Sequence, residues 1–180
     1  LWKKIIKDDQ PALLLADDAL LSRCIPELLV ELSLNQDVDL INFENRGRKK
    51  FVSRSSVDLA CNSKLLRLYQ DRTGAAGYIL WPSGAKKLIQ HEKKKGIALA
   101  DAHIVDCREI KTCQVEPAPI IQLDMCEYYG VTNPYSKYIS ASTVSTRNNS
   151  KGGLYFQMKR VYFQLELGLW QLFLLTKSDR

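Results

Sequence analysis

Two adjacent carboxylates, Asp17 and Asp18, are the residues of this sequence in which chemistry is most readily expected. They follow residues 12–16, a short apolar run that is typical of a strand buried on both faces of a sheet. The carboxyl end of a parallel strand is where α/β sheets bind ligands, and paired carboxylates there can hold Mg²⁺ or Mn²⁺ against a diphosphate. The pair also fits a second interpretation, in which it caps the amino terminus of the helix that follows.

Asp101 and His103 are candidates for proton transfer, because a carboxylate or an imidazole can take the proton of an acceptor hydroxyl. His103 equally suits a partly buried, hydrogen-bonded side chain. Gly77 and Tyr78 are candidates for acceptor binding, since a glycine lets a sugar approach the backbone and an aromatic face lets it stack. A tyrosine that simply packs in a strand is the equal alternative.

The elements that must position these residues follow from the spacing of apolar side chains. Helices are predicted over residues 1–8, 22–34 and 82–95, with Pro26 and Glu27 in the first turn of the second helix. Strands are predicted over residues 12–16, 38–43, 51–52, 65–69, 75–81 and 110–115, and Pro117 and Pro119 mark an extended crossing. This order predicts an α/β sheet domain.

The length of 180 residues suits one domain with a short appendage. Residues 131–153 are rich in Ser, Thr, Asn and Gly, which predicts a flexible loop or linker after a domain of residues 1–130. Residues 154–180 predict a C-terminal amphipathic helix. Its internal charges argue against a membrane span and favour packing on the domain or on a partner, with an interfacial helix as the alternative.

Charge and cysteine content narrow the partners and the compartment. The net charge is +6, and basic residues cluster at positions 46–50 and 93–95, which suits either solvated loops or contact with phosphates or an anionic membrane. No nucleic-acid-binding motif accompanies that charge, so nucleic acid is not an expected partner. Five cysteines without CxxC spacing and only two histidines predict reduced thiols in a cytoplasmic protein rather than a zinc site.

Several separate blocks, in the same order, resemble glycosyltransferase family 25, the lipooligosaccharide and lipopolysaccharide enzymes. The blocks are residues 1–6, 13–22, 38–44, 77–80, 84–89 and 116–122, with Asp101 after the helix of the fifth block. The resemblance implies a GT-A-like α/β fold, a sheet flanked by helices. It further implies transfer of a hexose, galactose or glucose, from a UDP-sugar to a lipooligosaccharide or lipopolysaccharide acceptor.

The resemblance also implies roles for particular residues. Asp17 and Asp18 match the end of the acidic motif of the family and would bind the donor and its Mn²⁺ or Mg²⁺. Asp101 falls where the family usually has an Asp after this helix, and it is the expected catalytic base. The expected acceptor contacts, Gly77, Tyr78 and His103, follow from their residue types alone. The expected location is cytoplasmic, peripheral at the anionic surface of the inner membrane.

Two departures from the family pattern leave a second function open. Ala16 occupies the first acidic position of the motif, and the amino-terminal strand that helps to hold the nucleotide has no counterpart in this sequence. The expected fold is therefore incomplete at its amino terminus. A catalytically inactive or truncated domain that acts as a binding module is the alternative.

Overall fold

The structure, a computed structural model, describes residues 1–33, 37–70, 74–96 and 99–135, and the single positions 158, 161, 162, 165, 168, 169, 172 and 173. The chain divides into two compact units, Leu1–Asn133 and Pro134–Arg180, and each is described by itself. All elements discussed below belong to the first unit.

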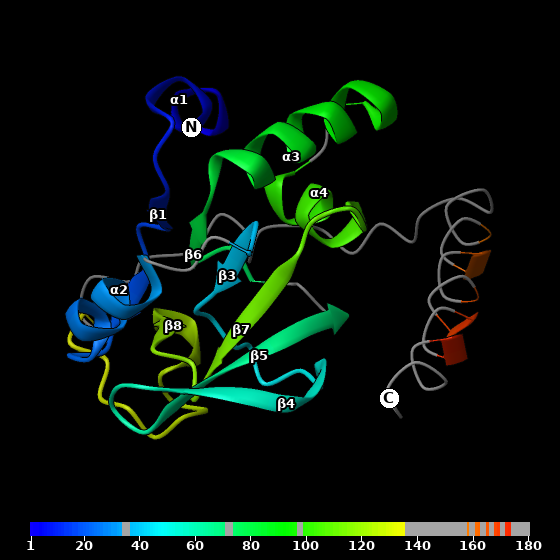
Figure 1. The fold of residues 1–180 in the computed structure, drawn as a ribbon. Helices are drawn as coiled ribbons and strands as arrows, with labels where there is room; N and C mark the ends of the chain where they lie inside the picture. Colours follow the sequence, from blue (N-terminus) through cyan, green and yellow to red (C-terminus); the bar gives the residue numbers. More distant parts are fainter. Residues whose placement is uncertain are drawn as a thin grey trace. The chain divides into compact units, whose positions relative to one another are not determined.

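A six-stranded mixed sheet forms the centre of the first unit, in the order β1-β6-β3-β7-β5-β4 (Figure 1). Its strands are β1 (Ala12–Leu15), β3 (Leu40–Asn42), β4 (Phe51–Leu59), β5 (Ser63–Gln70), β6 (Gly77–Leu80) and β7 (Thr112–Glu116). The β3·β7 pair is parallel, and the other pairs are antiparallel. Two short strands, β2 (Ala19–Leu21) and β8 (Ile120–Gln122), pair antiparallel in a separate ribbon.

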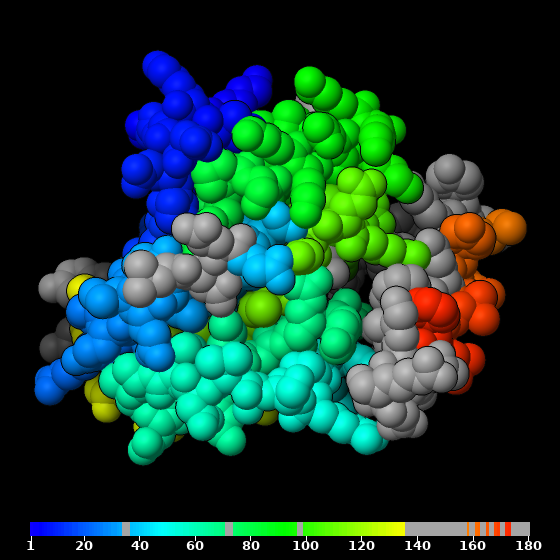
Figure 2. All heavy atoms as spheres, in the orientation of Figure 1, coloured from blue at the N-terminus to red at the C-terminus, as the bar shows by residue number. Residues whose placement is uncertain are grey.

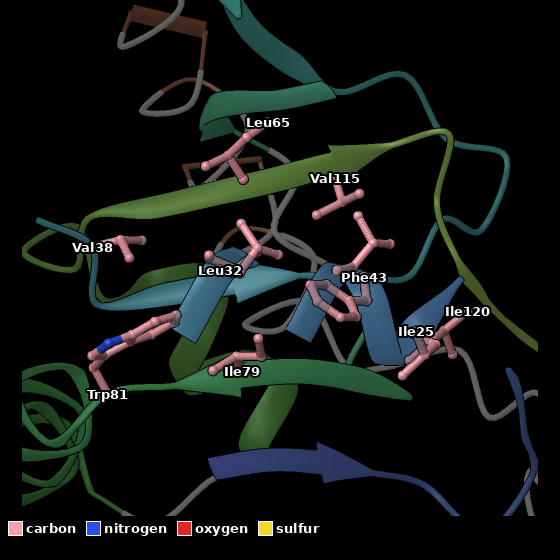
Figure 3. Packing of buried hydrophobic residues seen from close by; sticks show 11 residues of the cluster. Ile25, Leu32, Val38, Phe43, Leu65, Ile79, Trp81, Val115 and Ile120 are labelled. Atoms are coloured by element: carbon pink, nitrogen blue, oxygen red, sulfur yellow. The ribbon is translucent and has the colours of Figure 1, made fainter. Parts of the chain in front are cut away.

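Helices cover both faces of the sheet because successive residues of its strands point to opposite sides. The helices are α1 (Trp2–Asp8), α2 (Ile25–Ser33), α3 (Pro82–Lys95) and α4 (Ala100–Asp106), with a short 3₁₀ turn, η1 (Leu123–Met125). Ile41 and Ile79 join the core cluster on the α2 side, which Figure 3 shows. Leu40 and Leu80, one position away in each strand, join the cluster formed with α1, α3 and α4.

Asp39 fastens α3 to the sheet from the position just before β3. Its buried carboxylate accepts hydrogen bonds from Ser83 Oγ at 2.7 Å, from Lys87 Nζ at 2.6 Å and from Lys111 N at 2.7 Å. Burial alone would raise the pKa of Asp39, but the bonds from Lys111, Lys87 and Ser83 outweigh it and lower that pKa. One ionised side chain therefore links β3, α3 and the start of β7.

The predicted α/β class, with a sheet flanked by helices, is confirmed. The helices predicted over residues 1–8, 22–34 and 82–95 correspond to α1, α2 and α3, and Pro26 and Glu27 do lie in the first turn of α2. The strand predicted at residues 51–52 is much longer, because β4 continues to Leu59 in a hairpin with β5. Helix α4 was not predicted, since its seven residues offer too few apolar positions for a helical period to be visible.

The prediction for the first strand is wrong in two respects. Residues 12–15 do form a strand, but β1 lies at the edge of the sheet and pairs antiparallel with β6, so it is neither parallel nor buried on both faces. Leu15 is 46% exposed. A run of four apolar residues has the same pattern in a central strand and in this edge strand, whose Leu13 and Leu14 pack against the two different core clusters.

Most of the C-terminal predictions lie outside the described residues. Of the predicted linker 131–153 the structure describes residues 131–135 only, and of the helix predicted over residues 154–180 it describes only the scattered positions given above, all of them helical. Within the described parts of the chain, no helix is both long and apolar enough to cross a membrane.

Candidate active site

Asp17 and Asp18 occupy the tight turn between β1 and β2. Ala19 N donates to Ala16 O at 3.3 Å across the turn, Ala16 N donates to Ala76 O at 2.9 Å, and Leu123 N donates to Asp18 O at 3.0 Å. The turn is therefore tied to the segment before β6 and to η1. The alternative of a helix cap is wrong, because β2 separates the two carboxylates from α2.

Arg46 lies at the centre of the charged groups around this turn. Its Nη2 atom is 2.7 Å from Asp124 Oδ2, and its Nη1 atom is 3.9 Å from Glu44 Oε1. Burial raises the pKa of Asp18 and of Asp101, and the positive charge of Arg46 opposes both rises. One guanidinium thus acts on four carboxylates that come from four separate segments of the chain.

The loop that carries Arg46 has a defined conformation. Gly47 has a φ of +67°, and its N–H donates to Asn45 Oδ1 at 2.9 Å and to Tyr129 Oη at 3.0 Å. The same Tyr129 hydroxyl donates to Asn45 O at 3.0 Å. A side chain at position 47 would also meet the ring of Tyr128, since a Cβ there would lie 3.0 Å from it. These contacts hold the backbone on both sides of Arg46.

Glu44 is a fully buried carboxylate directly behind Arg46. Its Oε2 atom accepts a 2.7 Å hydrogen bond from Ala76 N, whereas its buried Oε1 atom has no hydrogen-bond partner. Burial raises the pKa of Glu44; the Ala76 bond and the charge of Arg46 oppose the rise, and Asp101 adds to it. A buried acceptor without a donor is costly, so the contact with Arg46 at 3.9 Å is what compensates this oxygen.

The carboxylates at the turn fit a divalent cation by their chemistry. Partial burial raises the pKa of Asp18, and the negative charges of Asp17 and Asp124 raise it further. Among the described residues the only group of three ligand atoms within 4.8 Å lies elsewhere, so Asp17 and Asp18 would supply one or two oxygens. That number is common for Mg²⁺ bound together with substrate phosphates and water.

Asp101 lies in the first turn of α4, where it also faces the charge of Arg46. Partial desolvation raises the pKa of its carboxyl, although the residue as a whole is exposed. A carboxyl whose pKa is moved toward neutrality and which solvent can reach suits proton transfer. The charge of Arg46 acts on both Asp101 and Asp18, two residues that the sequence predicts separately.

Tyr78 and His103 line a cavity of about 390 Å³ between α1, β6 and α4. Trp2 Nε1 donates to the Tyr78 hydroxyl at 3.3 Å, and the rings of Trp2 and His103 meet edge to face with centroids 6.3 Å apart. Both predicted acceptor residues are themselves buried. Ala100, the neighbour of Asp101, lines the same cavity.

Gly77 has a packing explanation in this structure. A Cβ at position 77 would lie 2.3 Å from Ile120 Cδ1, so the absent side chain makes room for β8 against β6. Glu44 and Asp124, two of the four carboxylates around Arg46, were not among the predicted site residues. Glu44 had a usable signal, because it directly follows a core strand, whereas nothing in the sequence distinguishes Asp124.

The mixed sheet, the helices on both faces and the acidic turn after β1 define a GT-A-like α/β domain. Glycosyltransferase family 25 (LPS biosynthesis protein) has a model that matches residues 1–105, and the chain belongs to this family. No curated protein matches the sequence. Membership implies glycosyl transfer in lipopolysaccharide biosynthesis, with a nucleotide-sugar donor and a lipopolysaccharide acceptor.

Proposed function

We propose that this chain transfers a hexose, galactose or glucose, from a UDP-sugar to a lipooligosaccharide or lipopolysaccharide acceptor. One observation carries the proposal beyond family membership: the Asp18 turn and Arg46 both contact η1, through Leu123 N at 3.0 Å and Asp124 Oδ2 at 2.7 Å, and the charge of Arg46 also reaches Asp101. A diphosphate needs cationic partners, and an acceptor hydroxyl needs a base, so this grouping supplies both requirements at one place.

Each of these residues has a separate role in the proposed reaction. Asp17 and Asp18 hold Mn²⁺ or Mg²⁺, which offsets the negative charge that develops on the leaving UDP. Arg46 donates hydrogen bonds to the diphosphate. Asp101 takes the proton of the acceptor hydroxyl while that oxygen bonds to the anomeric carbon and the bond from this carbon to the diphosphate oxygen breaks. A single displacement of this kind inverts the anomeric configuration.

The cavity beside α4 is the proposed acceptor subsite. Tyr78 and His103 supply a hydroxyl and an imidazole to a space whose lining is otherwise mainly apolar, a mixture that suits a sugar ring. The acceptor is anchored in a membrane, and the basic residues at positions 46–50 would meet its phosphates or the anionic surface. We therefore place the protein at the cytoplasmic face of the inner membrane, as a peripheral protein.

A thermal-shift measurement with UDP and MnCl₂ tests donor binding. We expect the two together to raise the Tm of the wild-type protein, and the rise to disappear in Asp18→Ala. Asp58→Asn, which removes an exposed carboxylate from β4, is the matched control and should keep the shift. A wild-type protein without any response to UDP and Mn²⁺ would refute the proposal.

Transfer itself is measured with labelled UDP-galactose and UDP-glucose and purified lipooligosaccharide. The second candidate function, a binding module, is favoured by Ala16, which leaves the turn without the first carboxylate of the motif. A chain that binds UDP with Mn²⁺ but transfers neither sugar would support the binding module. Loss of transfer in Asp101→Asn, with the UDP-induced shift intact, would support the catalytic role of Asp101.

A further inference from the structure

A cysteine and a glutamate at the start of α2 meet a second cysteine, distant in sequence, on the surface of the first unit. Cys24 precedes α2, Glu27 lies in its first turn, and Cys61 lies in the turn between β4 and β5. The two Sγ atoms and a carboxylate oxygen of Glu27 all lie within 4.8 Å of one another. Cys61 Sγ donates to Glu27 Oε2 at 3.5 Å. We call Cys24, Glu27 and Cys61 the thiol cluster.

The backbone on both sides of the thiol cluster is fixed. Ala60 N donates to Glu31 Oε2 at 2.8 Å, which joins the hairpin turn to α2, and Figure 2 shows the light-blue atoms of α2 directly against the teal atoms of the hairpin. Cys24, Leu59 and Ala60 all pack against the core cluster of Figure 3. The ligand atoms are therefore held together by two elements that share one core, and little ordering would accompany the binding of an ion.

The chemistry of the three groups favours a cation. Their sulfur and oxygen atoms bring several lone pairs within 4.8 Å of one another, and the Cys61 thiol donates to Glu27 Oε2 at 3.5 Å. A divalent cation placed among the three atoms accepts these lone pairs, and each thiol gives up its proton as its sulfur becomes a ligand.

The ligand types select among cations. Thiolate sulfur and carboxylate oxygen are both ligands of zinc, whereas Mg²⁺ and Ca²⁺ take oxygen ligands. Three protein ligands leave one tetrahedral position for water. The residues are also distinct from Asp17 and Asp18, where an oxygen-preferring cation is expected.

We propose that Cys24, Glu27 and Cys61 bind a thiophilic divalent cation of the zinc type, which fastens the β4–β5 hairpin to α2. This site stands apart from the proposed transfer reaction, and neither proposal depends on the other. Spacing alone did not suggest it, because the second cysteine comes from a hairpin turn and the third ligand from a helix.

Cobalt titration of the fully reduced protein tests the site. We expect one equivalent of Co²⁺ to produce a thiolate-to-cobalt charge-transfer band that Zn²⁺ then abolishes. The band should be absent from Cys24→Ser and from Cys61→Ser, and Glu27→Gln should weaken affinity by at least about tenfold, the lower range for loss of an outer-shell partner of a metal site. Cys113→Ala removes a thiol outside the cluster and should leave the titration unchanged.

Circular dichroism of each variant before titration separates loss of a ligand from loss of the fold. A folded wild-type protein that gives no charge-transfer band would overturn the proposal. So would a band that persists in the folded Cys24→Ser/Cys61→Ser double variant. A Cys24–Cys61 disulfide that forms under the reducing conditions of the titration, seen as a mass two hydrogens lower, would overturn it as well.

Discussion

The Ala76 amide donates a 2.7 Å hydrogen bond to one oxygen of the Glu44 carboxylate, while the other oxygen has no hydrogen-bond partner and faces Arg46. The carboxylate is fully buried, so its charge is only partly compensated. Urea unfolding can measure the effect of this buried carboxylate on stability, and pH profiles can measure the effect of Arg46 on neighbouring carboxyl groups.

Glu44→Gln should change the dependence of stability on pH. Burial raises the pKa of Glu44 in the folded state, so the folded protein holds this proton more tightly than the unfolded chain does. Wild-type stability therefore falls as pH rises from the ordinary glutamate value of about 4.3 through the raised pKa. The neutral glutamine lacks this fall. Urea unfolding at pH 4 and pH 7.5 should show the variant gaining on the wild-type protein at the higher pH; an unchanged difference would contradict the cost of the buried charge.

Gly74→Ala should destabilise the protein more than Gly96→Ala. Both glycines have positive φ, +103° and +89°, so either substitution strains the backbone by about 1 kcal/mol. Only at position 74 would the new Cβ meet a side chain, 2.6 Å from Glu44 Oε2, whereas the space around Gly96 is open. We expect an additional loss of roughly 1–3 kcal/mol for Gly74→Ala in urea unfolding. Equal losses would mean that Glu44 moves aside without cost.

Arg46→Met should weaken donor binding and move the pH profile of transfer. Arg46 lowers the pKa of Asp101, so its removal raises that pKa, and the base then loses its proton only at a higher pH. The acid limb of the kcat/KM profile should move to higher pH, and the UDP–Mn²⁺ thermal shift should shrink. Arg23→Met, which removes an exposed arginine outside the basic loop, is the control and should change neither. If the two variants had identical pH profiles and thermal shifts, Arg46 would have no role in donor binding or transfer.

Asp39→Ala should cost roughly 3 kcal/mol of unfolding free energy, the lower range for removing one partner of a buried ion pair. Asp8→Ala removes the exposed pair with Lys4 and should cost less than about 1 kcal/mol. The folded-state pKa of Asp39 is lowered, so its contribution is present above the unfolded value of about 3.9 and is lost as pH falls through the lowered value. The difference between wild type and Asp39→Ala should therefore narrow in acid; a constant difference would show that packing, not charge, accounts for it.

The elements of this fold were predictable wherever the apolar period was long enough. The fourteen-residue helix α3, with Pro82 at its start, and the strand at Gly77–Leu80 follow directly from the sequence. Strand order does not, because it depends on pairing between distant segments. The apolar run 12–16 alone therefore predicts a strand buried on both faces, whereas β1 lies at the edge of the sheet. The seven residues of α4 are too few to show a period.

For the site, the sequence indicates which residue types could act, but it does not indicate which of these residues lie close together. Asp17, Asp18 and Asp101 are recognisable from the sequence as carboxylates in a family pattern. Arg46, whose charge acts on Asp18 and Asp101, comes from a basic loop that suits solvent exposure equally well. Asp124 lies in a 3₁₀ turn and acquires meaning only through its 2.7 Å contact with Arg46. Gly77, in contrast, is a predicted site residue whose lack of a side chain is explained by its packing against the core residue Ile120.

The position of β7 bears on which part of the chain can fold alone. The family match ends at residue 105, yet β7 begins at Thr112 and lies between β3 and β5 in the middle of the sheet. A fragment cut at the end of the match would leave two interior strands with unpaired edges, which are prone to aggregate. The region recognised by the family and the cooperative folding unit are therefore different lengths, and expression should retain at least residues 1–133.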